Sequence, residues 1–479
     1  MREKILVAIA ALVAFGGAIA GPFQYDDYAI FADPALTSAS GWLEVWSPLQ
    51  TRPLTYFTFW MNFQAGGKAA WGYHALNLAI HVACCLLLLD VLCRLLPRGT
   101  AFAAALLFAV HPLQSEAVIY IFARSGMLAT LFCLLGLRSW LMGKHWLTVL
   151  CFVPALLAKE ECVAFPLFLA LLPEARARWR QLAAMCGLSL VAGLRVIAAT
   201  RAIVGAGSGF DAGATPASYL LAQGVVILRY LRLFVVPWGF SVDPEIDRQW
   251  AWLAWLLLFG LLALAWRWKH RFWIFGALVL LLPSSSIFPA ADLAADRRMY
   301  LPMIALCAAA AIFLVRWKPF VIVAVLACFA IWRVTVWGSE ESLWVEALRE
   351  GPKKVRPRLM LSRVVASAEG LRLMEEAGQL EPENPAVYSE TGRIYLQGGK
   401  YLEAFGAFGR ALALKPGDAR ALNNRGVALM AMGQAEAARV DFEAALKADP
   451  CQFDARVNLK RFDAPATCRY SDEQRAAMR

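Results

Sequence analysis

The sequence predicts an all-α protein in which a bundle of about eleven membrane-spanning helices is followed by a short α-solenoid of helical repeats. Of the 479 residues, 60% are hydrophobic and 17% are charged, whereas soluble domains carry roughly 25% charged residues. The apolar residues gather in long segments that short basic stretches separate, which is typical of multi-span membrane proteins. The C-terminal part is polar and repeats with a period of 34 residues, which indicates stacked helical repeats.

The apolar segments begin with residues 5–20, which follow Arg2 and Lys4. We interpret this segment as an uncleaved first span, because many spans follow it; a cleaved signal peptide ending near 18–20 is the alternative. Residues 22–70 then form the first long loop, whose Trp, Tyr and Phe content suits a membrane interface. The later apolar segments lie near 72–96, 100–112, 117–137, 146–158, 162–173, 182–200, 217–236, 250–266, 272–289, 299–315 and 319–337.

Basic clusters between the apolar segments predict the orientation, because Lys and Arg gather in cytoplasmic loops. The N-terminus is predicted inside and the C-terminus outside, and segment 217–236 fits this alternation only if it is re-entrant or interfacial. The loops predicted to face outward are 22–70, 111–116, 158–161, 201–215 and 290–298. The clusters predicted to face the cytoplasm are Arg94/Arg98, Arg138/Lys144, Arg176/Arg178/Arg180, Arg267/Lys269/Arg271 and Arg316/Lys318.

The C-terminal period has the tetratricopeptide pattern, in which small residues lie where two helices touch and a proline ends the second helix. Positions 34 residues apart pair Gly392 with Gly426, Ala404 with Ala438, Phe408 with Phe442, Ala411 with Ala445 and Pro416 with Pro450. The predicted domains are a membrane domain at 1–338, a degenerate repeat or linker at 339–384, repeats at 385–418 and 419–452, and a capping helix and tail at 453–479.

Two adjacent carboxylates, Asp26 and Asp27, open the first outer loop directly after the first span. Carboxylates at a membrane surface are costly without a purpose. A transfer onto a hydroxyl group needs a base that takes the hydroxyl proton, and a carboxylate at the mouth of a lipid-facing cavity has that chemistry. The alternative is a solvated loop or a helix cap.

Polar side chains inside or at the ends of spans are costly in lipid and mark functional positions. His74, Asn77 and His81 are three and four residues apart, so they share one helix face. For the histidines we predict hydrogen bonds between helices rather than metal ligation, and no metal site is predicted, since no Cys/His metal spacing occurs. The cations available to hold a phosphate are Arg124, Lys159, Arg297 and Arg298, with packing ion pairs as the alternative.

The motifs that are missing exclude several classes of protein. HExxH, GxSxG and Walker sequences do not occur, which argues against a zinc protease, a serine hydrolase and an ATP-driven pump. No basic surface with interleaved aromatic residues predicts nucleic-acid binding. Cys451 and Cys468 lie in the polar tail, where they form a disulfide in an oxidising compartment or remain two free thiols.

The chain resembles the transmembrane and tetratricopeptide-repeat (TMTC-like) O-mannosyltransferases of the GT-C glycosyltransferase superfamily. The repeats follow the spans as in that family, and the compact chain, rich in Ala and Arg, favours a bacterial member. The motifs that carry the resemblance occur in the family's order: YDDYAI at 25–30, RPLTYFTFWMN at 52–62, YHALNLAIH at 73–81, HPLQSEAV at 111–118, AKEECV at 158–163, PWGFSVD at 237–243 and ADRRMYLP at 295–302.

The resemblance implies a polytopic GT-C helical bundle and an inverting transfer of a sugar from a polyprenyl phosphate to a protein hydroxyl outside the cytoplasm. It implies Asp26, with Asp27 beside it, as the base, and Arg297 or Arg298 near the donor phosphate. The HPLQSEAV and AKEECV segments resemble cavity-lining pieces of the family. The residues that we predict to line the cavity are Arg52, His74, Asn77, His81, His111, Glu116, Glu160, Asp296 and Tyr300.

The same resemblance implies the partners and the location. The donor is an undecaprenyl- or dolichyl-phosphate-linked sugar among membrane lipids, and the acceptor is a protein or peptide that the repeats hold. No cofactor, no indicated metal and no nucleic acid belong to this expectation. The implied location is a bacterial inner membrane, with the N-terminus in the cytoplasm and the active site and repeats in the periplasm.

Two features depart from the family pattern. Where the family often has an acidic residue after Gly-Arg-Ala, this chain has Ala123-Arg124-Ser125-Gly126, and its repeat array is short. Both leave the sugar and the acceptor open. The alternatives are a GT-C transferase that modifies a lipid or glycan acceptor, a non-enzymatic membrane scaffold whose repeats recruit partners, and a transporter, for which no inverted repeat between the two halves is visible.

Overall fold

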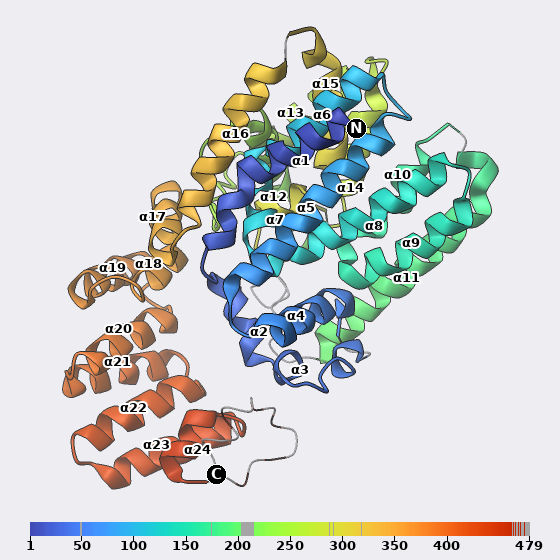
Figure 1. The fold of residues 1–479 in the computed structure, drawn as a ribbon. Coiled ribbons are helices and arrows are strands. Elements are labelled where there is room, and N and C mark those ends of the chain that lie inside the picture. Colours follow the sequence, from blue (N-terminus) through green and yellow to red (C-terminus); the bar gives the residue numbers. More distant parts are fainter. Residues whose placement is uncertain are drawn as a thin grey trace. The chain divides into compact units, whose positions relative to one another are not determined.

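The fold is that of a computed structural model, which describes residues 1–479 except 48–49, 174, 203–214, 287, 291, 318, 462, 464, 466–467, 469, 471–473 and 475–479. Every regular element in the described ranges is an α-helix or a 3-10 helix, and none is a strand. The all-α fold class is therefore confirmed (Figure 1). The chain forms two compact units. The span unit is Met1–Tyr28 with Ala39–Ser339, and the repeat unit is Ala29–Ser38 with Glu340–Arg479.

The span unit is a bundle of apolar helices. Its helices are α1 (Arg2–Phe15), α4 (Pro53–Gly66), α5 (Ala70–Leu92), α6 (Arg98–Val110), α7 (Ser115–Ile119), α8 (Arg124–Leu141), α9 (His145–Ala158), α10 (Phe165–Ala170), α11 (Trp179–Ala202), α12 (Pro216–Val235), α13 (Ala251–Trp266), α14 (Arg271–Leu281), α15 (Met303–Leu314) and α16 (Pro319–Val336). α1 packs along α5, α6 and α16, with the N-terminus at one end of the bundle (Figure 1). Prolines begin α4, α12 and α16, where an intrahelical amide bond is not needed.

The described residues contain six helical stretches that are long and apolar enough to cross a membrane, and a seventh if one bent pair is counted. The bent pair is Arg98–Val110 with Pro112–Ile119, which meet at 51°. Four further apolar helices, α9, α13, α14 and α15, are shorter. The figure of about eleven spans therefore stays a prediction.

Two of the expected segments differ from the sequence-based prediction. α12 passes the length and hydropathy test for a full span, so its two arginines do not by themselves make it interfacial. Segment 162–173 holds only the six-residue helix α10 after a 3-10 turn at Glu160–Ala164, because Pro166 and the charged residues before it interrupt a longer helix. Most of the expected loop 201–215, together with Lys318, lies outside the described residues.

The outer surface of the span unit is apolar. On α13 the exposed side chains include Leu256, Leu257, Phe259 and Leu264, while many polar and charged side chains of the unit are buried inside it. A water-soluble bundle would show the opposite arrangement. The surface is therefore of the kind that lies against lipid tails.

Basic side chains gather at the end of the span unit that holds the N-terminus. Arg98, at the start of α6, pairs with Glu3 at 2.9 Å, and Arg138, at the end of α8, pairs with Asp90 at 2.8 Å. α1 leads from this end to the loop that holds Asp26, because α1 and the 3-10 helix Gly16–Ala20 precede that loop. The basic clusters and Asp26 thus lie at opposite ends of the first span.

The repeat unit is a run of paired helices, in agreement with the expected α-solenoid. α20 packs against α21, and α22 packs against α23, at the positions where the sequence places repeats 385–418 and 419–452. In both pairs a glycine admits a phenylalanine ring: Phe408 lies over Gly392, and Phe442 lies over Gly426. The helices are α2 (Ala29–Ala32), α3 (Pro34–Thr37), α17 (Glu340–Glu350), α18 (Val355–Leu361), α19 (Ser367–Leu380), α20 (Pro385–Gln397), α21 (Tyr401–Leu414), α22 (Ala419–Ala431), α23 (Ala435–Ala448) and α24 (Phe453–Leu459).

Replacing Gly392 with Ala is expected to loosen the first repeat. A Cβ atom at Gly392 would lie 2.8 Å from the Phe408 ring, and such overpacking costs about 1–3 kcal/mol. Gly409 on α21 is the matched control, because a Cβ there meets no atom within 4 Å and Gly→Ala in a helix then stabilises by roughly 0.5–1 kcal/mol. Hydrogen exchange of α20 and α21 in the full chain should speed up in Gly392→Ala and slow down in Gly409→Ala.

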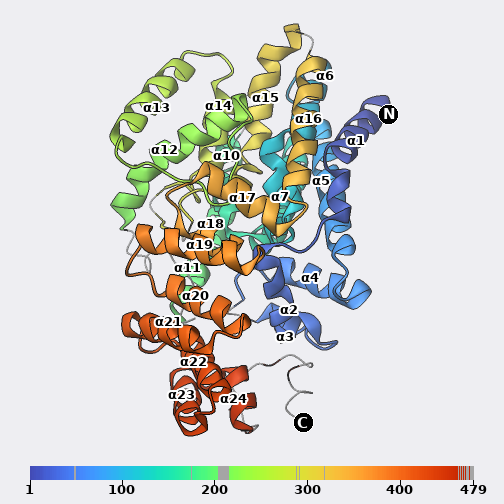
Figure 2. The same ribbon diagram turned by 90° about the vertical axis from the view of Figure 1, so that its left-hand side faces the viewer.

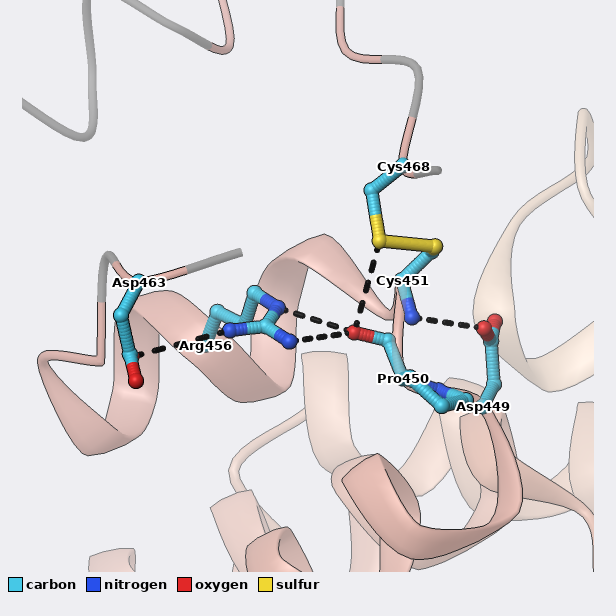
Figure 3. Close-up of a disulfide and its surroundings, with 6 residues drawn as sticks. All are labelled: Asp449, Pro450, Cys451, Arg456, Asp463 and Cys468. Carbon is cyan, nitrogen blue, oxygen red and sulfur yellow. Dashed lines mark hydrogen bonds and ion pairs between the residues drawn. A yellow bond between two sulfur atoms is a disulfide. The ribbon is translucent and has the colours of Figure 1, made fainter. Parts of the chain in front are cut away.

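A disulfide closes the end of the repeat unit (Figure 3). Cys451 and Cys468 are joined across a Cα–Cα distance of 5.2 Å, so the alternative of two free thiols is wrong for this structure. Arg456 holds the neighbouring turn by donating to the carbonyl of Pro450 at 2.9 and 2.6 Å. Disulfides persist in oxidising compartments, and closing a loop of this size stabilises a fold by about 3 kcal/mol.

Candidate active site

The two carboxylates of the first outer loop lie on one short 3-10 turn, Tyr25–Tyr28, yet they have different surroundings. Asp27 is fully buried and accepts hydrogen bonds from the amides of Phe122 at 2.8 Å and Gln24 at 3.0 Å. Asp26 is exposed. Tyr25, just before it, has a φ of 53°, in the left-handed region that residues with a Cβ seldom adopt. Such a strained turn is typical of a functional loop.

Asp27 therefore has the geometry of an anchor. One oxygen accepts from the Phe122 amide and joins the turn Tyr25–Tyr28 to the segment that leads into α8. The other accepts from Gln24, directly before the turn. Burial raises the pKa of Asp27 to about 8, although the backbone amides that donate to it lower the pKa in part. A carboxyl group held in this way is not open to an incoming hydroxyl group. These contacts favour a supporting role for Asp27 in the loop, and the catalytic role beside Asp26 stays a prediction.

Asp26 faces three other polar side chains. They are the Tyr120 hydroxyl, the Arg297 guanidinium and the Asp292 carboxylate. Partial burial raises the pKa of Asp26 above its ordinary value, and Tyr120 and Arg297 lower the pKa in part because they stabilise the charged form. Asp26 is therefore an accessible carboxylate whose proton affinity its neighbours adjust.

Arg297 is held between two carboxylates. Its guanidinium pairs with Glu116, and with Asp292 at 3.2 Å, while its backbone amide donates to Glu116 at 3.1 Å. The guanidinium carbon lies 5.9 Å from the centre of the Tyr120 ring. Its charge is therefore compensated locally, and its position is fixed beside Asp26.

Arg298 is buried in a different environment. It donates to the carbonyls of Asp292 at 2.8 Å and Leu293 at 3.2 Å, and its third partner is the Tyr219 hydroxyl at 3.5 Å. Each of these partners is neutral, and in the described part of the chain no carboxylate lies within ion-pair distance of Arg298. Glu161 stabilises the charge of Arg298 only from beyond ion-pair distance. A buried cation that no carboxylate contacts directly is costly, and it attracts an anionic ligand.

Asp296 and the lysine-containing segment form further ion pairs. Asp296 is paired with Arg229 of α12, and both side chains are buried. Lys159 pairs with Glu161 at 2.7 Å, and burial lowers the pKa of Lys159. Both pairs fit the packing alternative, and Lys159 is a compensated charge, unlike Arg298.

Glu160 does not pair with Lys159 but forms an ion pair with Arg52 of the first outer loop. Arg52, directly before α4, donates to Glu160 from two nitrogens, at 2.9 Å from Nε and 2.5 Å from Nη2. Burial raises the pKa of Glu160, but the Arg52 guanidinium outweighs this effect and lowers the pKa to about 2. The pair thus remains ionised and fixes α4 against the segment after α9.

Arg124 does not reach the site surface. Its side chain is fully buried and donates to Asn77 at 2.6 Å, to the Thr58 hydroxyl at 3.1 Å and to the Tyr73 carbonyl at 3.0 Å. Phe59 covers one face of the guanidinium at 4.7 Å. A phosphate would have to displace these partners, so the contacts of Arg124 favour the packing alternative, and its role as a donor-phosphate ligand stays a prediction.

The three histidines singled out in the sequence make hydrogen bonds inside the bundle. His81 contacts the Tyr300 hydroxyl at 2.8 Å and the Ala109 carbonyl at 3.1 Å. His111 contacts the Phe234 carbonyl at 3.0 Å, and His74 contacts the Pro22 carbonyl at 3.3 Å. Over the described ranges, no group of three or more His, Cys, Asp or Glu is placed to hold a metal ion. His81 and Tyr300 lie in the interior rather than beside Asp26.

Figure 2 shows α12, α13 and α14 as neighbouring helices of the span unit. An apolar cavity of about 260 Å³ lies among these three helices. Its walls include Trp255 and Phe259 of α13 and Leu281 of α14. Met299, which directly follows Arg298, also lines it. Tyr230 lines it too and donates its hydroxyl to the Ala295 carbonyl at 3.0 Å. An apolar cavity therefore adjoins the segment that carries Arg298, the buried arginine whose hydrogen-bond partners are neutral.

Two residues of this region were missed by the sequence analysis. Tyr120 lies between Asp26 and Arg297, but in the sequence it stands among apolar residues, and its spacing of four residues from Glu116 is the only cue. Arg229 lies within the apolar segment 217–236, and its partner Asp296 is 67 residues away, so only the fold reveals the pair.

Comparisons with known proteins agree with this architecture. Residues 392–433 match the family model described as TPR repeat, and residues 419–450 match the one described as Tetratricopeptide repeat. The chain is 33% identical over 152 residues to the protein O-mannosyl-transferase TMTC1 of Homo sapiens. It is 28% identical over 155 residues to the protein O-mannosyl-transferase F38B6.6 of Caenorhabditis elegans. Part of the chain is thus similar to proteins that are named protein O-mannosyl-transferases.

The similarity to these TMTC-like proteins is partial. It covers 28% of this chain and 17% of human TMTC1, and 29% of this chain and 22% of the Caenorhabditis elegans protein. The chain thus spans about a fifth of the length of the curated relatives that it matches. Among solved structures, a MamA fragment from Desulfovibrio magneticus RS-1 aligns at 19% identity over 25% of this chain and 70% of that chain, with a TM-score of 0.23.

Proposed function

We propose that the protein is a GT-C-type glycosyltransferase that transfers a sugar from a polyprenyl phosphate to a protein hydroxyl on the extracytoplasmic face of a membrane. The observation that carries this proposal is the exposed Asp26 carboxylate, which lies beside Tyr120 and Arg297. The names of the relatives, which are protein O-mannosyl-transferases, support a transfer onto protein hydroxyls.

In the proposed inverting step, the acceptor oxygen attacks the anomeric carbon of the sugar while Asp26 takes the proton of the hydroxyl group. The bond between the anomeric carbon and the phosphate oxygen breaks, and the polyprenyl phosphate leaves with the electron pair. A base works best when its pKa lies near the working pH, so the upward shift of the Asp26 pKa through partial burial supports this role.

Arg298 is the residue that we propose for the donor phosphate. Its three partners are neutral, whereas Arg297 and Lys159 are already paired with carboxylates. A guanidinium also stabilises the charge that develops on the departing phosphate. The apolar cavity that Met299 lines would then take the prenyl chain close to the phosphate.

The proposed orientation places the active site and the repeat unit outside the cytoplasm. The basic residues Arg94, Arg98 and Arg138 lie at the end of the first span opposite Asp26, and such residues favour the cytoplasmic side. The Cys451–Cys468 disulfide favours an oxidising compartment for the repeat unit. Ala29–Ser38, two residues after Asp27, belongs to that same unit, which supports one common side. A bacterial inner membrane with the site in the periplasm remains our proposed location.

The repeat unit is proposed to hold the protein acceptor. Helices α19, α20 and α21 border a groove of about 900 Å³ whose lining includes Arg372, Tyr388, Tyr395 and Arg410. Arg410 lies 4.3 Å from the centre of the Tyr388 ring, so the groove combines aromatic and charged surface. Peptide segments bind such grooves through mixed polar and aromatic contacts.

The test is a transfer assay with the purified full chain in lipid nanodiscs. A labelled polyprenyl-phosphate mannose is offered with a Ser/Thr-containing peptide, and in parallel with a glycolipid acceptor. We expect label on the peptide, and loss of that label when Asp26 is replaced by Asn. Mass spectrometry of glycoproteins from a strain that lacks the gene should show the same modification missing.

The alternatives have distinct outcomes in this assay. Label on the glycolipid alone would favour a GT-C transferase for lipid or glycan acceptors. Absence of transfer from any polyprenyl-phosphate sugar, with a well-folded protein, would refute the enzymatic proposal and leave a membrane scaffold with repeats. Assays with and without a metal chelator test whether the transfer needs a metal ion. We expect the same transfer rate in both.

A further inference from the structure

Tyr120 is buried at the point where the candidate base and the neighbouring cation meet. Its hydroxyl faces Asp26, and its ring lies under the Arg297 guanidinium at 5.9 Å. Among the described residues this hydroxyl has no hydrogen bond of regular geometry. A buried hydroxyl without a settled partner needs an explanation, and catalytic hydrogen bonds in ligand-free proteins are often loose and tighten only around the substrate.

Hydrogen bonds fix the backbone around Tyr120, so the position of its side chain is also restricted. Asn77 donates to the Tyr120 carbonyl at 3.4 Å, and Asp27 accepts from the amide of Phe122 at 2.8 Å. Trp337 and Tyr25 pack against the Tyr120 ring, with centroid distances of 5.8 and 6.2 Å. The ring is therefore enclosed, and its contact with Tyr25 places it beside the turn Tyr25–Tyr28 that carries Asp26.

We propose that Tyr120 is a positioning residue of the transfer reaction, with its hydroxyl orienting the Asp26 carboxylate and its ring seating Arg297. The inference rests on the proposed function but concerns a residue that touches the base rather than the substrate. When an acceptor hydroxyl approaches, the Tyr120 hydroxyl occupies one lone pair of Asp26 and directs the other toward the acceptor proton. Arg297, held by Glu116 and Asp292, then stays within reach of the ionised base.

The charged and titratable groups around Asp26 determine the sign of the expected pH effect. Asp292 opposes the ionisation of Asp26. Burial raises the pKa of Asp27, which lies beside it on the same turn, to about 8, so Asp27 is uncharged at acidic pH and adds no repulsion there. Tyr120 and Arg297 favour the charged form and so lower the pKa of Asp26. Removing the Tyr120 hydroxyl must therefore raise the pKa of Asp26, and the fraction of active, ionised base at low pH must fall.

The decisive variant is Tyr120→Phe, which keeps the ring and removes only the hydroxyl. We expect the acidic limb of the pH–rate profile to move up by about half to one pH unit, with turnover close to that of the wild type above this limb. Tyr120→Leu, which also removes the seat of Arg297, should lose turnover at every pH. Tyr73→Phe is the matched control, because the Tyr73 hydroxyl donates to the Gly67 carbonyl at 3.0 Å and leaves the acidic limb in place.

A second measurement does not depend on activity. Carbodiimide modification of Asp26, followed across pH by peptide mass spectrometry, reports the protonated fraction of this carboxyl group directly. The midpoint should move up in Tyr120→Phe and stay at the wild-type value in Tyr73→Phe. An unchanged midpoint in Tyr120→Phe overturns the inference even if the enzyme is active. A shifted midpoint in a protein without transferase activity would support the contact and refute the proposed function instead.

Discussion

Replacing Asp26 with Asn is expected to lower the transfer rate by about 10²–10⁴-fold, the range that a general base contributes. Asn is nearly isosteric with Asp but does not take up the acceptor proton. Asp26 is exposed, and its neighbours Tyr120 and Arg297 remain in place. The dissociation constant for the donor should therefore stay within about twofold of the wild-type value, and the protein should fold as the wild type does. Turnover with a labelled donor and equilibrium donor binding to nanodisc samples measure the two effects separately.

Asp33 is the matched control for this substitution. It lies seven residues further along the chain and caps α3 by accepting from the Ala35 amide at 3.0 Å. Asn is as good as Asp at a helix N-cap, so Asp33→Asn should transfer sugar at the wild-type rate. An Asp26→Asn protein with wild-type turnover would refute the assignment of the base, whatever its effect on folding.

Replacing Arg298 with Gln is expected to weaken donor binding by about 10- to 100-fold, because a hydrogen bond to a charged group contributes about 1.5–3 kcal/mol. The same change should leave the melting temperature at or above the wild-type value. Gln removes a buried charge that has no ion-pair partner among the described residues, and such a charge costs stability. Thermal unfolding and donor titration of one sample therefore separate a ligand-binding arginine from a structural one.

Arg229→Gln is the comparison variant for Arg298→Gln, because the opposite effect on the melting temperature is expected. It is also a buried arginine, but it is paired with the buried Asp296. Arg229→Gln leaves that carboxylate unpaired, which typically costs about 3–5 kcal/mol, so its melting temperature should fall clearly. If Arg298→Gln instead melts as early as Arg229→Gln and keeps its donor affinity, Arg298 is a packing residue and the phosphate site lies elsewhere.

The sequence predicts the features that depend on local composition and period. Long apolar segments predict the helical span unit, and the 34-residue spacing of Gly392 and Gly426 predicts the repeat helices, because each reflects contacts that recur along the chain. The position of Asp26 directly after the first span also marks it as a candidate. These predictions need no knowledge of which helices are neighbours.

The remaining features depend on contacts between distant segments. Arg124 and Arg298 look alike in the sequence, and both donate to neutral groups. Arg124 is enclosed by Asn77, Thr58 and Tyr73 inside the bundle, whereas Arg298 is held by two carbonyls of its own loop and by the Tyr219 hydroxyl. Asp26 and Asp27 are adjacent, yet the turn sends one outward and the other onto the Phe122 amide. Packing between distant segments therefore decides which charged side chains are paired and which carboxylate is accessible. The sequence pattern alone does not contain this information.

The membership of Ala29–Ser38 in the repeat unit has a practical consequence. The chain leaves the span unit after Tyr28, returns at Ala39 and leaves again at Glu340, so three peptide linkages connect the two units rather than one. Ala32 lines a pocket together with Arg420 and Asp454. A fragment cut at residue 340 would lack this piece of its own surface, so the two units do not separate cleanly by a single proteolytic cut.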